Sequence, residues 1–100
     1  MADVKYLFIF ITPGCDPAVH RSVIATSEGP TTTVGTSGVQ QACEVAKAAV
    51  EAGEADFIEL CGAFGEDGCR KVVEAVGDKV PVGYVTYFPG DSERVDALFA

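Results

Sequence analysis

Glu59 is the residue whose position points most directly to chemistry. It lies within FIELC, where strand alternation places its side chain on the same sheet face as Phe57 and Cys61. A carboxylate in a helix-covered strand is costly unless it is paired or near solvent. An edge strand or an ion pair with Lys5 or Arg70 would explain it structurally. The functional alternatives are a general acid or base, or a hydrogen-bond acceptor for a bound ligand.

The thiols and the single histidine form a second candidate set. Cys15 and Cys61 lie at the ends of two expected strands, and His20 lies one short turn after Cys15, which suggests a nucleophilic or metal-binding cluster. The spacing of the four cysteines contains no CxxC pair, however, and we therefore predict neither a metal nor another cofactor. Cys43 and Cys69 fall on the inward faces of expected helices, where a free cysteine behaves as a small hydrophobic residue. The candidate catalytic residues are therefore Glu59, Cys61 and His20.

Four glycine-containing loops are candidates for a binding rim: TPGCDP, GTSG, CGAFGEDG and YFPGDS. Glycine in a turn is explained by its tolerance of positive φ, but together these loops would leave an open edge that a small ligand could enter. In CGAFGEDG the acids Glu66 and Asp67 would repel a phosphate, whereas GTSG offers hydroxyl and backbone donors at a helix start, if it does more than cap that helix. The expected ligand-binding residues are Cys15, Arg21, Gly35, Thr36, Ser37, Gly62, Gly65, Thr86 and Tyr87.

Composition excludes several classes of function. The formal net charge is -8, and the seven basic residues are scattered, which argues against nucleic acids and anionic membrane surfaces as partners. The apolar segment 6–11 is too short to span a bilayer and lacks the features of a secretory leader, so we expect a cytoplasmic protein with reduced thiols. Because 48% of the residues are hydrophobic, we expect a homodimer or higher homo-oligomer in preference to a monomer.

Hydrophobic patterning predicts alternating strands and helices. Residues 4–12, VKYLFIFIT, suit a central strand buried on both faces. Residues 22–26 and 31–34 form a hairpin or meander, residues 55–61 a strand, and residues 80–87 the last strand. A helix begins at Ser37, which has capping-box spacing with Gln40, and ends at Gly53. A second helix covers residues 66–76 and ends at Gly77, and Ser92 caps a short final helix.

A loose repeat fixes the expected fold class. Segments EVAKAAVEAGEADFIELCGAFGED and CRKVVEAVGDKVPVGYVTYFPGDS each run helix, glycine, strand, glycine loop and acids. This order is typical of right-handed β-α-β winding and a parallel sheet. We therefore predict one α/β domain over residues 1–100, with an open, mostly parallel sheet of four to five strands, two long helices and a short C-terminal helix. The layering would be Rossmann-like, flavodoxin-like or that of a half-barrel completed by a second copy.

Two resemblances accompany these patterns. EAGEADFIELCGAFGED resembles the helix, glycine, strand and loop segment of tryptophan synthase α-type barrels, and that resemblance puts Glu59 at the catalytic acid/base position, although the segment lacks the PFSDP sequence. Over nearly the whole length, KYLFIFITPGCDPAVHR, IELCGAFG and VPVGYVTYFPG resemble a family of small bacterial α/β proteins of unassigned function, which implies no catalytic residue.

Three functional hypotheses follow. The first is a small-molecule-binding protein that holds a small polar metabolite at the glycine-rich loops, near Glu59, Cys61, His20 and Arg21. The second is a non-catalytic homo-oligomeric or regulatory module that buries apolar surface against a second copy or a partner. The third is a proton-transfer enzyme that uses Glu59. A pocket beside Glu59 would favour the first hypothesis over the second.

Overall fold

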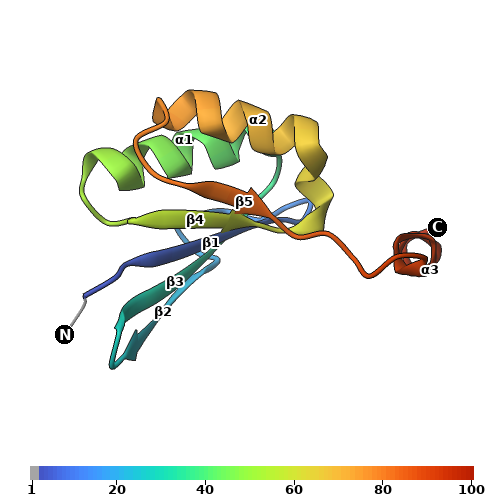
Figure 1. Cartoon of the computed structure of the whole chain (residues 1–100), viewed down its shortest axis with the longest axis horizontal. Coiled ribbons are helices and arrows are strands. Elements are labelled where there is room, and N and C mark those ends of the chain that lie inside the picture. The colour runs from blue at the N-terminus through green and yellow to red at the C-terminus, as the bar shows by residue number, and fades with distance from the viewer. Residues whose placement is uncertain (1–2) are drawn as a thin grey trace.

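The computed structural model describes residues 3–100 as a single mixed α/β domain (Figure 1). The elements run β1 (Tyr6–Ile11), β2 (Arg21–Thr26), β3 (Gly29–Thr36), α1 (Val39–Glu51), β4 (Phe57–Leu60), a 3-10 turn (Gly62–Phe64), α2 (Gly65–Val76), β5 (Val82–Tyr84) and α3 (Asp91–Leu98). The strand order is β2-β3-β1-β4-β5. β1, β3, β4 and β5 are mutually parallel and β2 is antiparallel to β3, so the predicted fold class and the hairpin are confirmed.

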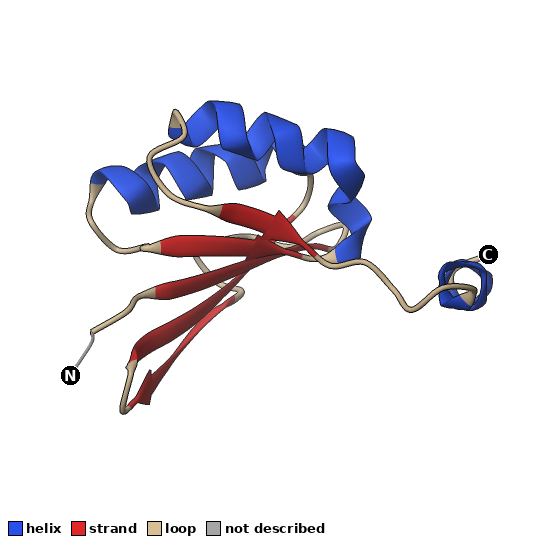
Figure 2. Cartoon of the chain, in the orientation of Figure 1, coloured by secondary structure: helices blue, strands red, loops and turns tan. Residues whose placement is uncertain are grey.

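The two long helices lie on the same face of the sheet (Figures 1 and 2). α1 connects β3 to β4 and α2 connects β4 to β5, as expected for successive β-α-β units. β1 is central, as predicted, but it is not buried on both faces, because Leu7 and Ile9 are buried whereas Tyr6, Phe8 and Phe10 remain partly exposed. The reason is topological: β1 is followed by a hairpin instead of a helix, and no helix of the described chain crosses the other face.

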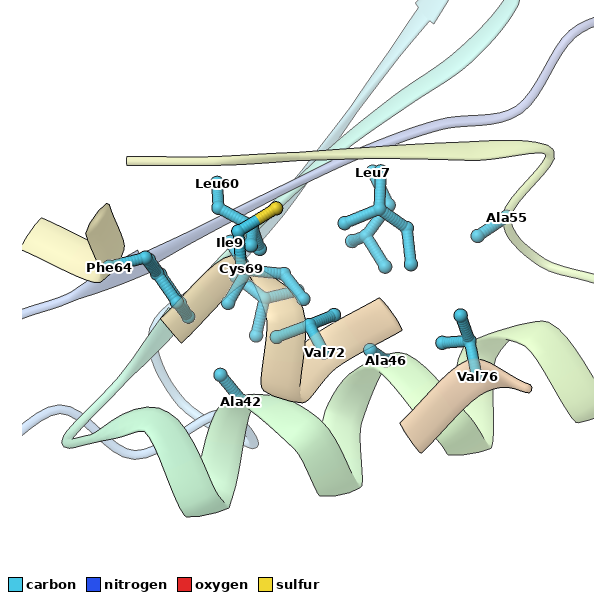
Figure 3. Packing of buried hydrophobic residues seen from close by; sticks show 12 residues of the cluster. Leu7, Ile9, Ala42, Ala46, Ala55, Leu60, Phe64, Cys69, Val72 and Val76 are labelled. Atoms are coloured by element: carbon cyan, nitrogen blue, oxygen red, sulfur yellow. The ribbon is translucent and has the colours of Figure 1, made fainter. Parts of the chain in front are cut away.

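The hydrophobic core fills the layer between the sheet and these two helices (Figure 3). Ile9 from β1 and Leu60 from β4 are register partners and are fully inaccessible to solvent. Ala42 and Ala46 of α1 and Val72 of α2 face them, and the small alanines let α1 approach the sheet closely. This layer fixes the positions of the loops at the carboxyl ends of the strands.

The helix ends differ in detail from the predicted caps. The residue before α1 is Gly38, and no side chain caps it; Ser37 instead donates from its backbone N and its Oγ to Oε1 of Gln41, at 2.8 and 3.0 Å. The expected pairing with Gln40 was therefore wrong by one residue. α3 is likewise preceded by Gly90 with no side-chain cap, so Ser92 lies inside the helix. The predicted stop of α2 is confirmed, because Gly77 adopts a left-handed conformation with φ of 65°.

Candidate functional site

The carboxyl ends of β1, β3 and β4 form a common rim, which is where we expected a ligand site. Three polar side chains of this rim already have partners within the protein. The buried Thr36 Oγ1 donates to the Phe10 carbonyl at 2.9 Å, and the Ser37 hydroxyl donates to Gln41. Nδ1 of His20 accepts from the Asp16 backbone N at 2.8 Å. These groups therefore hold the loops in place, and their donors and acceptors are largely used for that purpose.

Two glycines of the rim, Gly35 and Gly62, allow neighbouring side chains to pack against the backbone and so leave no hollow there. A Cβ on Gly35 would lie 2.7 Å from the ring of Phe10 and 3.1 Å from Sγ of Cys15. A Cβ on Gly62 would lie 3.0 Å from the hydroxyl of Tyr87. Gly65 has φ of 61° and open space around it, and Thr86 is exposed in the segment after β5. Glycine at positions 35 and 62 is thus explained by packing against neighbouring side chains.

The four cysteines are all free thiols, and they play different parts. Sγ of Cys61 accepts a 3.4 Å hydrogen bond from the Ile11 backbone N, which ties the ends of β1 and β4 together. Cys69 is buried in the core, as predicted. Burial raises the pKa of the Cys69 thiol, and also that of Cys43, where nearby Lys71 acts in the opposite direction. Both are therefore less acidic than an ordinary thiol.

Glu59 lies on the sheet face that the helices leave uncovered. Its Oε1 accepts a 2.5 Å hydrogen bond from the hydroxyl of Tyr6, whose ring stacks on Phe57 with centroids 4.9 Å apart. Glu59 is exposed, and within the described residues it makes no ion pair with Lys5 or Arg70: Lys5 Nζ donates to the Gly53 carbonyl. Arg70 pairs instead with Glu66 on its own helix at 2.8 Å. Among the hydrogen bonds of residues 3–100, none joins two of the three catalytic candidates Glu59, Cys61 and His20.

The largest hollow described lies elsewhere, in a groove of about 570 Å³ between α1 and the β2-β3 hairpin. It forms because the twisted hairpin extends beyond the part of the sheet that α1 covers (Figure 1). The residues that line it are Lys5, Leu7, Pro17, Arg21, Val23, Pro30, Thr32, Gln41, Glu44, Val45, Ala48, Ala49 and Glu54. Arg21 alone comes from the predicted ligand-binding residues. Sequence reasoning missed the others because no local pattern shows which helix face overhangs an edge hairpin.

The end of the groove next to the rim carries the free hydrogen-bond donors. Arg21, the first residue of β2, donates from Nε to the Pro17 carbonyl at 3.3 Å and makes no ion pair within the described part of the chain. Gln41 Oε1 is occupied by Ser37, so its NH₂ group remains available as a donor. Glu44 lines the same hollow and supplies one negative charge. The middle is apolar, with Leu7, Val23 and Val45 among its lining.

Two classes of site are missing from the part of the chain that the structure describes. No group of three or more His, Cys, Asp or Glu side chains is arranged to hold a metal ion. Within residues 3–100, no helix has both the length and the apolar character needed to cross a membrane.

Comparison with known proteins identifies the family. The model of a family of unknown function (DUF6506) matches residues 4–100. The chain belongs to this family. The match covers nearly the whole domain, from the approach to β1 to the end of the chain, and therefore includes the groove, the rim and α3. No curated protein and no solved structure matches the chain.

Proposed function

We propose that the protein binds a small polar metabolite, and that the binding site is the groove between α1 and the β2-β3 hairpin. The observation that carries this proposal is a hollow of about 570 Å³ with the guanidinium of Arg21 at one end, where it makes no ion pair within the described residues. Ligand sites are usually clefts of about 300–1,000 Å³ with apolar walls and a few polar groups that fix orientation. The site is therefore next to the rim that the sequence indicated, on the side of the sheet covered by α1.

The chemistry of the groove favours a ligand with a carboxylate. The guanidinium of Arg21 presents several N–H donors in a plane that matches the two oxygens of a carboxylate, and the Gln41 amide adds another donor. The apolar part of the ligand would cover Val23 and Val45. Glu44 would accept from an ammonium group, so an amino acid would pair with both Arg21 and Glu44, whereas a simple carboxylic acid would pair with Arg21 alone.

The test is a titration of the ¹⁵N-labelled protein with a panel of amino acids and short-chain carboxylic acids, followed by NMR. We expect shifts concentrated on the amides of β2 and the first half of α1. Arg21→Gln should raise the dissociation constant of the tightest-binding ligand by about tenfold or more, because a hydrogen bond to a charged group contributes about 1.5–3 kcal/mol. Arg70→Gln, which removes an exposed guanidinium on α2 outside the groove, is the matched control and should leave the affinity unchanged.

A second pair of variants tests the groove independently of charge. Ala48→Trp should block the hollow, whereas Ala63→Trp, on an exposed residue of the 3-10 turn outside the groove lining, should not. Equal binding by Arg21→Gln, Ala48→Trp and the unmodified protein would exclude the groove. Chemical-shift changes confined to residues 12–16 and 61–65 would instead place the ligand at the carboxyl ends of the strands.

Two other functions are favoured less. Self-assembly as a homo-oligomer is supported by the sheet face that the two long helices leave uncovered. Proton transfer by Glu59 has one supporting observation, the short hydrogen bond from Tyr6, but Glu59 lines none of the three hollows described. We also propose a cytoplasmic location, which is supported by four free thiols among the described residues.

A further inference from the structure

The face of the sheet opposite the two long helices, here called the uncovered face, is almost free of charge. Register and strand alternation assign its residues: Tyr6, Phe8 and Phe10 from β1, Gly29, Thr31, Thr33 and Gly35 from β3, Ser22, Ile24 and Thr26 from β2, Phe57 and Glu59 from β4, and Gly83 from β5. Glu59 is the single charged residue of this set, although 22% of the chain is charged. Depletion of charge together with enrichment in aromatic residues is typical of the core of a protein interface.

The C-terminal arm, residues 88–99, is the second unpartnered feature. It leaves the sheet after β5 and places α3 apart from the rest of the domain (Figures 1 and 2). Phe88, Leu98 and Phe99 are 79%, 80% and 86% exposed, and α3 has no buried residue. Isolated helices shorter than about 12–15 residues are marginal in water. An eight-residue helix therefore needs packing against another surface, and Val95, Leu98 and Phe99 have the spacing of a single helix face.

The surface area of the domain agrees with a missing partner. The chain exposes 6327 Å². A compact protein of 10.4 kDa is expected to expose about 5,400 Å². The excess of about 900 Å² is close to the roughly 800 Å² that each partner loses in a standard stable interface.

We propose that two copies of this chain form a symmetric dimer in which the uncovered faces oppose one another and each C-terminal arm packs on the other copy. A second copy fits better than an unrelated partner, because each chain offers one unpartnered face and one unpartnered arm, and a two-fold axis satisfies all four at once. Sheets that pack face to face lie about 10 Å apart, a gap that the rings of Phe8, Phe10 and Phe57 can fill. Glu59 enters this interface with its Oε1 already hydrogen-bonded to Tyr6.

Two neighbouring residues of β2 provide a matched test of the face. Ile24 and Val23 are 59% and 60% exposed on the same edge strand, but they point to opposite faces of the sheet. The unmodified protein should sediment near twice 10.4 kDa. Ile24→Lys should raise the dimer dissociation constant by at least tenfold and give a folded monomer, whereas Val23→Lys should remain dimeric. A single-chain mass for the unmodified protein at tens of micromolar would overturn the proposal, as would equal dissociation by both variants.

The arm is tested separately. The double variant Leu98→Ser, Phe99→Ser should also raise the dimer dissociation constant at least tenfold, because it removes two apolar side chains that would pack on the other copy. Both side chains are exposed in a single chain, so we expect the fold of residues 3–84 to be unchanged. In a sample that mixes labelled and unlabelled copies, isotope-filtered NMR should detect contacts between α3 of one copy and β1 or β4 of the other. An unchanged dissociation constant, or contacts only within one copy, would overturn the exchange of arms.

Discussion

The hydroxyl of Tyr6 on β1 donates a 2.5 Å hydrogen bond to Oε1 of Glu59 on β4. The two residues are not register partners: Tyr6 is opposite Phe57, and Glu59 is opposite Phe8. The stack of Tyr6 on Phe57 directs the phenol along the strand to reach the carboxylate diagonally. This contact, and neither an edge strand nor an ion pair with Lys5 or Arg70, is the structural explanation of a glutamate in the middle of FIELC, because β4 lies between β1 and β5.

This pair predicts a loss of stability at alkaline pH. Burial, followed by the hydrogen bond to Glu59 and its charge, raises the pKa of Tyr6 from 10.0 to about 12. Because the pKa of Tyr6 is higher in the folded than in the unfolded protein, protonated Tyr6 contributes fully to the free energy of unfolding below pH 10. This contribution is lost as the pH rises from 10 through 12. Chemical denaturation across this range should show the decrease in the unmodified protein and in Tyr87→Phe, but not in Tyr6→Phe. An identical decrease in Tyr6→Phe would contradict the assignment.

Leu60 should be among the most costly residues to truncate. It is fully buried between the sheet and α2, opposite Ile9 in β1 and Tyr84 in β5. Leu60→Ala should lower the free energy of unfolding by about 2–5 kcal/mol through lost apolar burial and a new cavity. The control Val19→Ala, in an exposed loop, should change it by about 0.5 kcal/mol or less. Urea denaturation followed by circular dichroism measures both values, and similar losses would be inconsistent with this core.

The turn after α2 should require glycine for backbone reasons alone. Gly77 has φ of 65°, and the nearest atom to an added Cβ is the end of the flexible Lys79 side chain at 4.0 Å. Gly77→Ala should therefore cost about 1–2 kcal/mol, the strain of an L-residue in the left-handed region. Gly83→Ala is the comparison, because Gly83 has open space and an ordinary strand φ, and there alanine should be neutral or slightly stabilising. Equal thermal unfolding midpoints for the two variants would refute this explanation.

The alkylation rates of Cys43 and Cys69 should be lower than that of a thiol in free solution. Since burial raises the pKa of Cys43 and Cys69, their thiolate fraction at pH 8 is reduced, and both should react more slowly than glutathione. Cys69 should react slowest, because its side chain is also buried in the core. Site-resolved mass spectrometry in native buffer measures the rates, and the same experiment in urea should remove the difference. Fast native labelling of Cys69 would argue against its core position.

The parts of the fold that depend on local sequence could be predicted. The continuous apolar run VKYLFIFIT, helical spacing in residues 39–50 and glycine at position 77 each act through neighbours a few residues away, so the elements and their order followed, whereas the expected burial of the first strand on both faces did not. Helix caps were less predictable, because α1 begins after Gly38 and Ser37 therefore hydrogen-bonds to Gln41 instead of Gln40. The final strand was expected over residues 80–87 but spans only Val82–Tyr84, because its length is set by pairing with its single neighbour, β4.

The candidate site depended on relationships that no local pattern encodes. The sequence by itself determined an α/β domain with a mostly parallel sheet of four to five strands, two long helices and an inward-facing Cys69, because side-chain periodicity and glycine conformations are local properties. Only the tertiary structure decided that both long helices cover one face, that Glu59 meets Tyr6, and that Arg21 borders a groove with α1. These outcomes depend on which strands become neighbours and which face each connection crosses, and that choice is made by packing between residues far apart in the chain.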